Sequence, residues 1–210
     1  MADSKLITCV FVFLATLVMF IESLPIENER NRRDAYTLYS ELVDKTERLR
    51  TMETTLLNNF KTNRLRNLAE LTGVTVPNLS DLMTFAFRST ASPSQLLSEY
   101  RDHFMRYQII MDFVLEDERN TTATPNFISD ITNVSLLLSF TITRLENVMR
   151  HLNVTVTPEK IPEEESPYFT PRWERNIYQR RLRDCFVLEQ LNQHLINAQN
   201  DFTKLRNDEN

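Results

Sequence analysis

Histidine, cysteine and clustered carboxylates are the side chains in this sequence that could bind a metal or act in catalysis. The histidines fall on three different predicted helices, without the Glu-x-x-His or His-x-x-x-His spacing that places two metal ligands on one helix face: His103, His151 and His194. Cys185 lacks the flanking glycines of a nucleophile elbow. The acidic run at residues 116–118 is more typical of a solvated helix end than of a metal cluster. The sequence therefore predicts no enzyme, no metal site and no cofactor.

The amino-acid composition excludes several classes of fold and partner. The 210 residues include 24 basic and 29 acidic side chains, for a net charge of −5, which argues against a nucleic-acid partner. Gly73 is the single glycine of the chain, so glycine-rich phosphate loops are excluded and an all-β fold built on tight turns is improbable. We expect an all-α protein.

The N-terminus has the pattern of a secretion signal. Lys5 precedes an apolar run over residues 6–21, and Glu22, Ser23, Leu24 and Pro25 follow it. The run is slightly short for a membrane span and no basic cluster follows it, so an uncleaved anchor is the less favoured alternative. We predict a signal peptide at residues 1–23 and a secreted, extracellular domain at residues 24–210 that does not insert into membranes after cleavage.

Asn-x-Ser/Thr sequons fit passage through a secretory pathway, although such triplets also arise by chance. The possible glycosylation sites are Asn78, Asn120, Asn133 and Asn153. After signal cleavage Cys185 is the remaining cysteine, so no internal disulfide can form. Cys185 falls on the apolar side of the last predicted helix, which favours a buried thiol over a disulfide to another chain.

Apolar residues recur at three- and four-residue steps over four segments, which predicts helices at about 32–61, 93–117, 126–152 and 172–205. Ser92, Pro93 and Gln95 form a capping-box start for the second helix. Thr124-Pro125 and Thr170-Pro171 mark the starts of the third and fourth helices in the same way. The helices form a single four-helix domain.

Connection lengths predict how the helices are ordered. About eight residues join the second and third helices and span at most roughly 28 Å, less than the roughly 37 Å of a 25-residue helix. These two helices are therefore expected to be antiparallel neighbours. The first and third connections have about thirty and nearly twenty residues, so both can cross the length of the bundle. The long, short, long pattern predicts an up-up-down-down bundle.

The last predicted helix carries a more specific pattern. Tyr178-Gln179-Arg180-Arg181 opens it, an apolar run extends from Leu182 to Leu195, and Asp201-Phe202 follows. This order resembles the last helix of the interleukin-6 family, most closely the ciliary neurotrophic factor, cardiotrophin-like and leukaemia inhibitory factor branch, where a Phe-x-x-Lys motif opens the helix. Here tyrosine replaces phenylalanine, arginine replaces lysine, and His194 stands where relatives often carry tryptophan.

The resemblance implies a secreted cytokine, with growth factor activity, that binds and clusters class I cytokine receptors as a monomeric ligand. Its expected partners are the shared signalling chain and a leukaemia inhibitory factor receptor-like chain, and the need for an alpha receptor stays open. The resemblance assigns receptor binding to Tyr178 and Arg181, with Trp173 beside them. The alternative is that Tyr178 and Trp173 cover the end of their own bundle and that Arg181 is a solvated charge.

Two further receptor surfaces follow from the family pattern alone. One combines the exposed side of the last helix, at Gln193, Asn197 and Asn200, with the preceding loop, and the other uses the exposed faces of the first and third helices, including Glu47, Arg48, Arg144 and Asn147. Two rival classes remain open: another helical hormone, such as a prolactin- or interleukin-11-like factor, and an amphipathic lipid-binding secreted protein.

Overall fold

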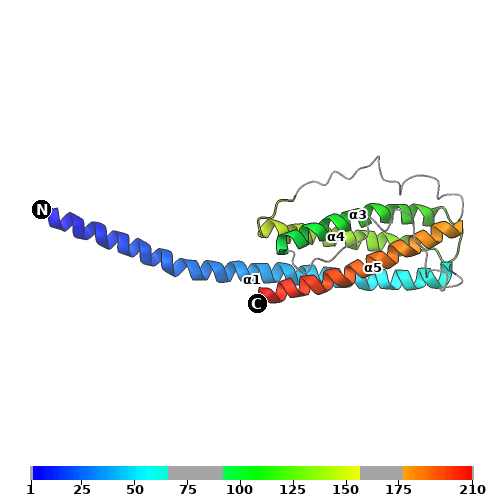
Figure 1. Cartoon of the computed structure of the whole chain (residues 1–210), viewed down its shortest axis with the longest axis horizontal. Coiled ribbons are helices and arrows are strands. Elements are labelled where there is room, and N and C mark those ends of the chain that lie inside the picture. Colours follow the sequence, from blue (N-terminus) through cyan, green and yellow to red (C-terminus); the bar gives the residue numbers. More distant parts are fainter. Residues whose placement is uncertain (1, 66–91, 157–176, 210) are drawn as a thin grey trace.

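The computed structural model describes residues 2–65, 92–156 and 177–209, with the backbone alone for residues 2–28 and Gln179. Within these ranges the chain forms four helices and no strand, namely α1 (Ala2–Arg64), α3 (Pro93–Arg119), α4 (Ile128–His151) and α5 (Ile177–Asp208). Figure 1 shows them packed side by side, with the N-terminal part of α1 projecting beyond the other three. The all-α prediction is confirmed. No helix in the described residues is long and apolar enough to cross a membrane.

The predicted helix boundaries agree best where the local signals are strong. Helices α3 and α4 match the predicted 93–117 and 126–152 to within two residues. The first helix differs from the predicted start near residue 32, because α1 is continuous from Ala2 and passes through Pro25. The leucine-, alanine-, glutamate- and arginine-rich residues on both sides of Pro25 are good helix formers. Residues 172–176 of the predicted fourth helix lie outside the described residues.

The first turns of α3 and α4 are stabilised in different ways. Ser92 caps α3 as predicted: its side chain accepts from the Gln95 backbone, and the Gln95 side chain accepts from the Ser92 N–H at 3.1 Å. The next helix starts two residues after the predicted residue 126, since α4 follows Phe127 and has no side-chain cap. Instead the Phe127 N–H donates to Glu118 Oε1 at 2.9 Å, so a carboxylate from α3 holds the start of α4.

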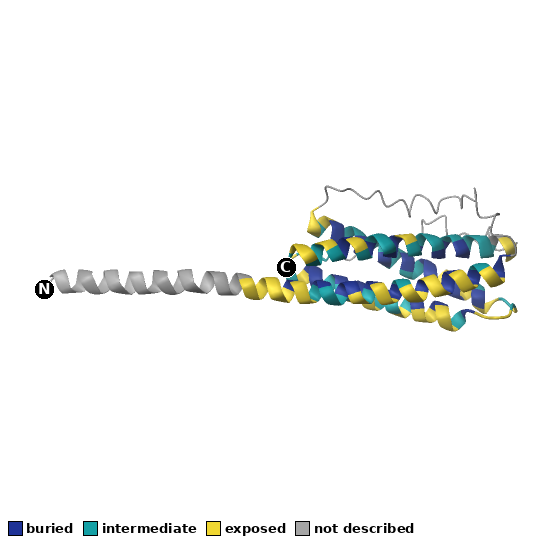
Figure 2. Cartoon of the chain, turned by 90° about the horizontal axis from the view of Figure 1, so that it is seen from below, coloured by how far each residue is buried: buried dark blue, intermediate teal, exposed yellow. Residues whose placement is uncertain are grey.

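The predicted apolar stripes meet in one core, which Figure 2 shows as the dark blue inner faces of the helices. Most stripe residues are buried, including Tyr39, Leu42, Leu49, Leu56, Phe60, Tyr100, Phe104, Met111, Ile131, Val134, Leu138, Leu145, Leu188, Leu191, Leu195 and Phe202. Cys185 is a buried free thiol, as predicted, and burial raises its pKa to about 12. Met52 and Ile177 have the spacing of the predicted apolar stripes of their helices but lie on the surface.

Each helix packs against two neighbours: α1 lies against α4 and α5, and α3 also lies against α4 and α5. Contacts at the helix ends show which ends meet. Arg64 at the end of α1 pairs with Glu118 at the end of α3, while the Phe60 ring lies 5.6 Å from the ring of Phe127, just before α4. At the opposite end, Arg32 donates to the backbone oxygen of Glu209, after α5.

Candidate functional site

A small pocket lies where α5 begins. Its volume is about 260 Å³, and the end of α1, the end of α3, the α3–α4 connection and the first turns of α5 all contribute to it. Its lining mixes apolar, polar and charged side chains: Phe60, Arg64, Asp117, Glu118, Asn120, Thr121, Thr122, Ala123, Ile177, Arg180, Arg181 and Asp184. The predicted receptor-binding residue Arg181 therefore belongs to a concave surface built by three helices.

Ion pairs hold the first turns of α5 against α3. Asp117 accepts from Arg180 at 3.4 Å and from Arg183, and Arg183 also reaches Asp184 at 2.7 Å. Asp184 is buried, and this burial raises its pKa to about 7 despite the opposing effect of Arg183. Arg180 and Arg183 are three residues apart and share one helix face, so both reach the same carboxylate.

Tyr178 and Arg181 are also three residues apart, and they lie on a different part of the helix surface. The Tyr178 side chain is 40% exposed and the preceding Ile177 is 56% exposed. Arg181 is half-buried in the pocket lining, and no carboxylate of the described residues pairs with it. The beginning of α5 thus presents two apolar side chains and a cation outward, while its two other arginines bind the bundle.

Several members of this site were not predicted. The helical spacing of Ile177 favours a core position, and the sequence predicted no contact for Arg180, Arg183 or Asp117. The interpretation of residues 116–118 as a solvated helix end is wrong for Glu118, which is buried and pairs with Arg64. The sequence signal that could have found this network is an acidic pair at the end of one helix and an i,i+3 arginine pair at the start of another.

The remaining predicted sites have varied locations. Trp173 and Asn78 lie outside the described residues. Asn120 is exposed at the C-cap of α3 and lines the pocket. Asn153 is exposed just after α4, with a φ of 56° that asparagine tolerates better than most residues. Asn133 is exposed within α4.

Several buried polar side chains from α1, α3 and α5 lie in the core. Buried His194 lies with Nδ1 3.3 Å from the Tyr107 hydroxyl, and its ring centroid is 5.1 Å from that of His103. Buried Glu53 accepts from Asn192. Among the described residues, no group of three or more histidine, cysteine or acidic side chains is placed to hold a metal ion.

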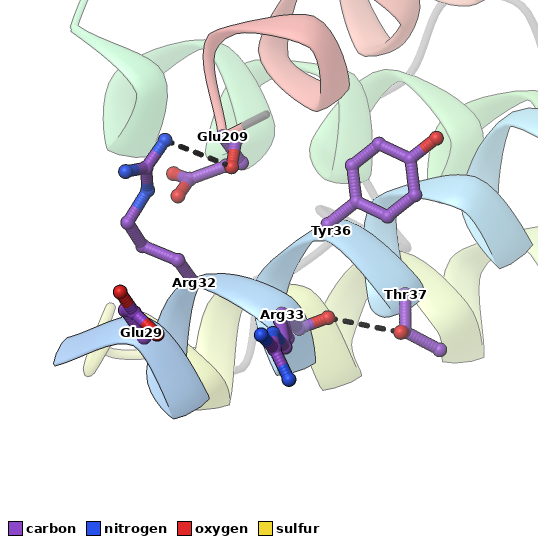
Figure 3. A pocket seen from close by; sticks show the side chains of 6 residues that line it. All are labelled: Glu29, Arg32, Arg33, Tyr36, Thr37 and Glu209. Atoms are coloured by element: carbon purple, nitrogen blue, oxygen red, sulfur yellow. Dashed lines mark hydrogen bonds between the residues drawn. The ribbon is translucent and has the colours of Figure 1, made fainter. Parts of the chain in front are cut away.

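A second pocket, of about 520 Å³, lies at the other end of the bundle, between α1 and the C-terminus of α5. Figure 3 shows its lining: Arg32 reaches toward Glu209, the Thr37 hydroxyl donates to the Arg33 backbone oxygen, and the Tyr36 ring stands apart from the charged groups. Arg32, Arg33 and Tyr36 are all exposed. Their arrangement brings no nucleophile against a base and is that of an open charged surface.

The first turns of α5 thus offer a surface for contact: exposed apolar groups, a guanidinium that no carboxylate of the described residues pairs with, and a pocket of mixed lining. Such a combination of an aromatic side chain and arginine is typical of protein interfaces. Comparison of the chain with models of known protein families, with curated proteins and with solved structures finds no match.

Proposed function

We propose that the chain is a secreted cytokine that binds class I cytokine receptors through the beginning of α5 and acts by clustering receptor chains. Tyr178 inserts its ring into an apolar pocket of a leukaemia inhibitory factor receptor-like chain, and Arg181 pairs with an acidic group beside that pocket. The ligand performs no chemistry. By holding two signalling chains together it raises their effective concentration.

The arrangement of the helices supports the up-up-down-down order of this class. Arg64 pairs with Glu118, which joins the C-terminal ends of α1 and α3. Arg101, near the start of α3, pairs with Glu146, near the end of α4, at 2.9 Å. Tyr100 in α3 donates to Asp201, near the end of α5, at 2.6 Å. These contacts fit α1 and α3 running in one direction and α4 and α5 in the other.

The observation that carries the proposal is that neighbouring α5 residues make different contacts: some pair within the bundle and others lie at its surface. Arg180 and Arg183 form ion pairs with Asp117. Tyr178 is exposed, and Arg181 has no carboxylate partner among the described residues. An aromatic and a cation left on one face are suited to a partner's pocket.

The test is binding of the secreted protein to immobilised receptor ectodomains of the interleukin-6 family, with Tyr178→Ala/Arg181→Ala as the informative variant. Removing two hot-spot side chains should weaken binding at least about thirtyfold, since a single hot-spot side chain already contributes on the order of 2 kcal/mol or more. Helical content and thermal midpoint should not change, because neither side chain lies in the core.

Asn58→Ala/Asn59→Ala provides the matched control, since both residues are exposed near the end of α1 and lie outside the pocket lining. This variant should bind as wild type does. Loss of folding together with loss of binding in the Tyr178 and Arg181 variant would return both residues to a purely structural role. Absence of binding by a folded wild-type protein would direct the search to receptors of other helical hormones.

A further inference from the structure

Helix α4 exposes two large apolar side chains on its outer face. Leu136 is 51% exposed and Phe140 is 47% exposed, although both belong to a helix whose opposite face is buried at Val134, Leu138 and Leu145. Residues four apart on a helix are surface neighbours. Leu136 and Phe140 therefore form one continuous apolar patch, named here the α4 patch.

A glycosylation sequon lies on the same helix face. Asn133 is exposed and precedes Leu136 by three residues and Phe140 by seven, so the three share one side of α4. At 1.5 Å per residue, Leu136 lies about 4.5 Å and Phe140 about 10.5 Å farther along the axis. Helical side chains lean toward the N-terminus, which tilts Leu136 toward Asn133. The α4 patch is thus within reach of the first sugars of a glycan on Asn133.

The size of the α4 patch favours a tethered occupant over a second protein. A stable protein partner usually covers about 800 Å² per side, far more than two half-exposed side chains offer. A glycan attached three residues away loses little translational freedom when it lies down on the helix, since it is already tethered. A few apolar contacts with sugar C–H groups are then sufficient to hold the glycan against the α4 patch.

We infer that an N-linked glycan on Asn133 lies over Leu136 and Phe140 and shields the α4 patch from water; this rests on the proposed secretion. Attachment forms a bond from Asn133 Nδ2 to the anomeric carbon of a lipid-linked oligosaccharide diphosphate. It breaks the bond from that carbon to the phosphate oxygen and releases the lipid diphosphate and one amide proton. The covered stretch of α4 is then closed to receptors.

The test uses the full chain secreted from glycosylating cells. Peptide mass mapping should find a glycan on Asn133. Asn133→Gln should bind several-fold more of an apolar fluorescent dye and self-associate more than wild type, because the α4 patch is uncovered. Ser135→Ala, which removes the same sequon and keeps Asn133, should do the same. Adding Leu136→Gln/Phe140→Gln to Asn133→Gln should return both readouts to the wild-type level.

Asn120→Gln is the matched control, because it removes a sequon at the C-cap of α3 and leaves α4 unchanged. Its dye binding should equal that of wild type. Secretion with unmodified Asn133, or a glycosylated Asn133 whose removal leaves dye binding unchanged, would overturn this inference alone. Retention of the chain inside the cell would overturn the proposed secretion and this inference with it.

Discussion

The buried carboxyl group of Glu53 makes the stability of the fold depend on pH. It is fully buried on α1, where Asn192 of α5 donates to one carboxylate oxygen while the other has no hydrogen-bond partner among the described residues. Burial raises the Glu53 pKa to about 7, and the bond from Asn192 and the charge of Lys61 only partly oppose this effect. The carboxyl group is therefore best accommodated in its neutral form.

The resulting pH dependence has a definite sign. The folded-state pKa of Glu53 lies above the unfolded value, so between about pH 4.5 and 7 the unfolded chain loses a proton that the folded chain keeps. This contribution to stability is complete below pH 4.5 and falls as pH rises, by about 1 kcal/mol per pH unit. Glu53→Gln, which keeps an acceptor for Asn192, should remove this loss and raise the thermal midpoint at pH 7.

Urea unfolding of both proteins from pH 4.5 to 8 measures the difference. Burial, followed by the charges of His194 and Arg106, lowers the His103 pKa to about 4, which gives stability a slope of opposite sign. That slope is common to wild type and variant and cancels when they are compared. Glu47→Gln, on an exposed face of the same helix, should leave the pH profile unchanged. Parallel profiles for wild type and Glu53→Gln would refute the assignment.

Between helices, the contact of α5 with α3 depends strongly on charge. Asp117 is the common acceptor for Arg180 and Arg183, and it binds the segment that carries Tyr178 and Arg181. Both arginines and the acidic side chain also line or flank the pocket between these elements, where Arg180 and Asp117 are among its lining residues. We therefore expect the Asp117 carboxylate to contribute to the orientation of the proposed receptor surface.

Asp117→Asn should loosen the beginning of α5. A neutral amide cannot pair with two guanidiniums, so we expect a loss of about 1–3 kcal/mol and faster hydrogen exchange in the first turns of α5. Asp112→Asn, also on α3 but exposed, provides the control and should have little effect. Unchanged exchange at the start of α5 in Asp117→Asn would show that packing alone holds this segment.

Considering the whole molecule, the sequon at Asn120 lies beside the proposed receptor surface. Asn120 lines the same pocket as Ile177 and Arg181, although it belongs to the end of α3. A glycan on Asn120 would stand beside the cation that the proposed receptor contact needs. Occupancy of this sequon and receptor affinity should therefore be coupled.

Asn120→Gln, secreted from glycosylating cells, should bind the leukaemia inhibitory factor receptor ectodomain more tightly than wild type in which Asn120 carries a glycan. Asn153→Gln, which removes the sequon just after α4, is the control and should bind as wild type does. Equal affinity of Asn120→Gln and fully occupied wild type would place the receptor away from this pocket.

Local signals were sufficient for much of the fold. The apolar period predicted four helices and most of the core, because a helix buries whatever recurs every three or four residues. Ser92 and Gln95 predicted the start of α3, since a capping box needs no contact beyond one turn. The buried position of Cys185 followed from the same periodicity.

Contacts between residues far apart in the sequence determined the start of α4 and the partners of the α5 arginines. Glu118 sets the start of α4 from another helix, so Thr124-Pro125 could not mark it. Arg180, Arg181 and Arg183 are alike in the sequence, and only the position of Asp117 on α3 separates the two that bind the bundle from the one that lies beside Tyr178. The helices and their apolar faces could be predicted from the sequence, because they depend on neighbours within a few residues. The ion pairs of the α5 arginines became visible only in the folded bundle, because ion pairing depends on side chains that the fold brings together from distant parts of the chain.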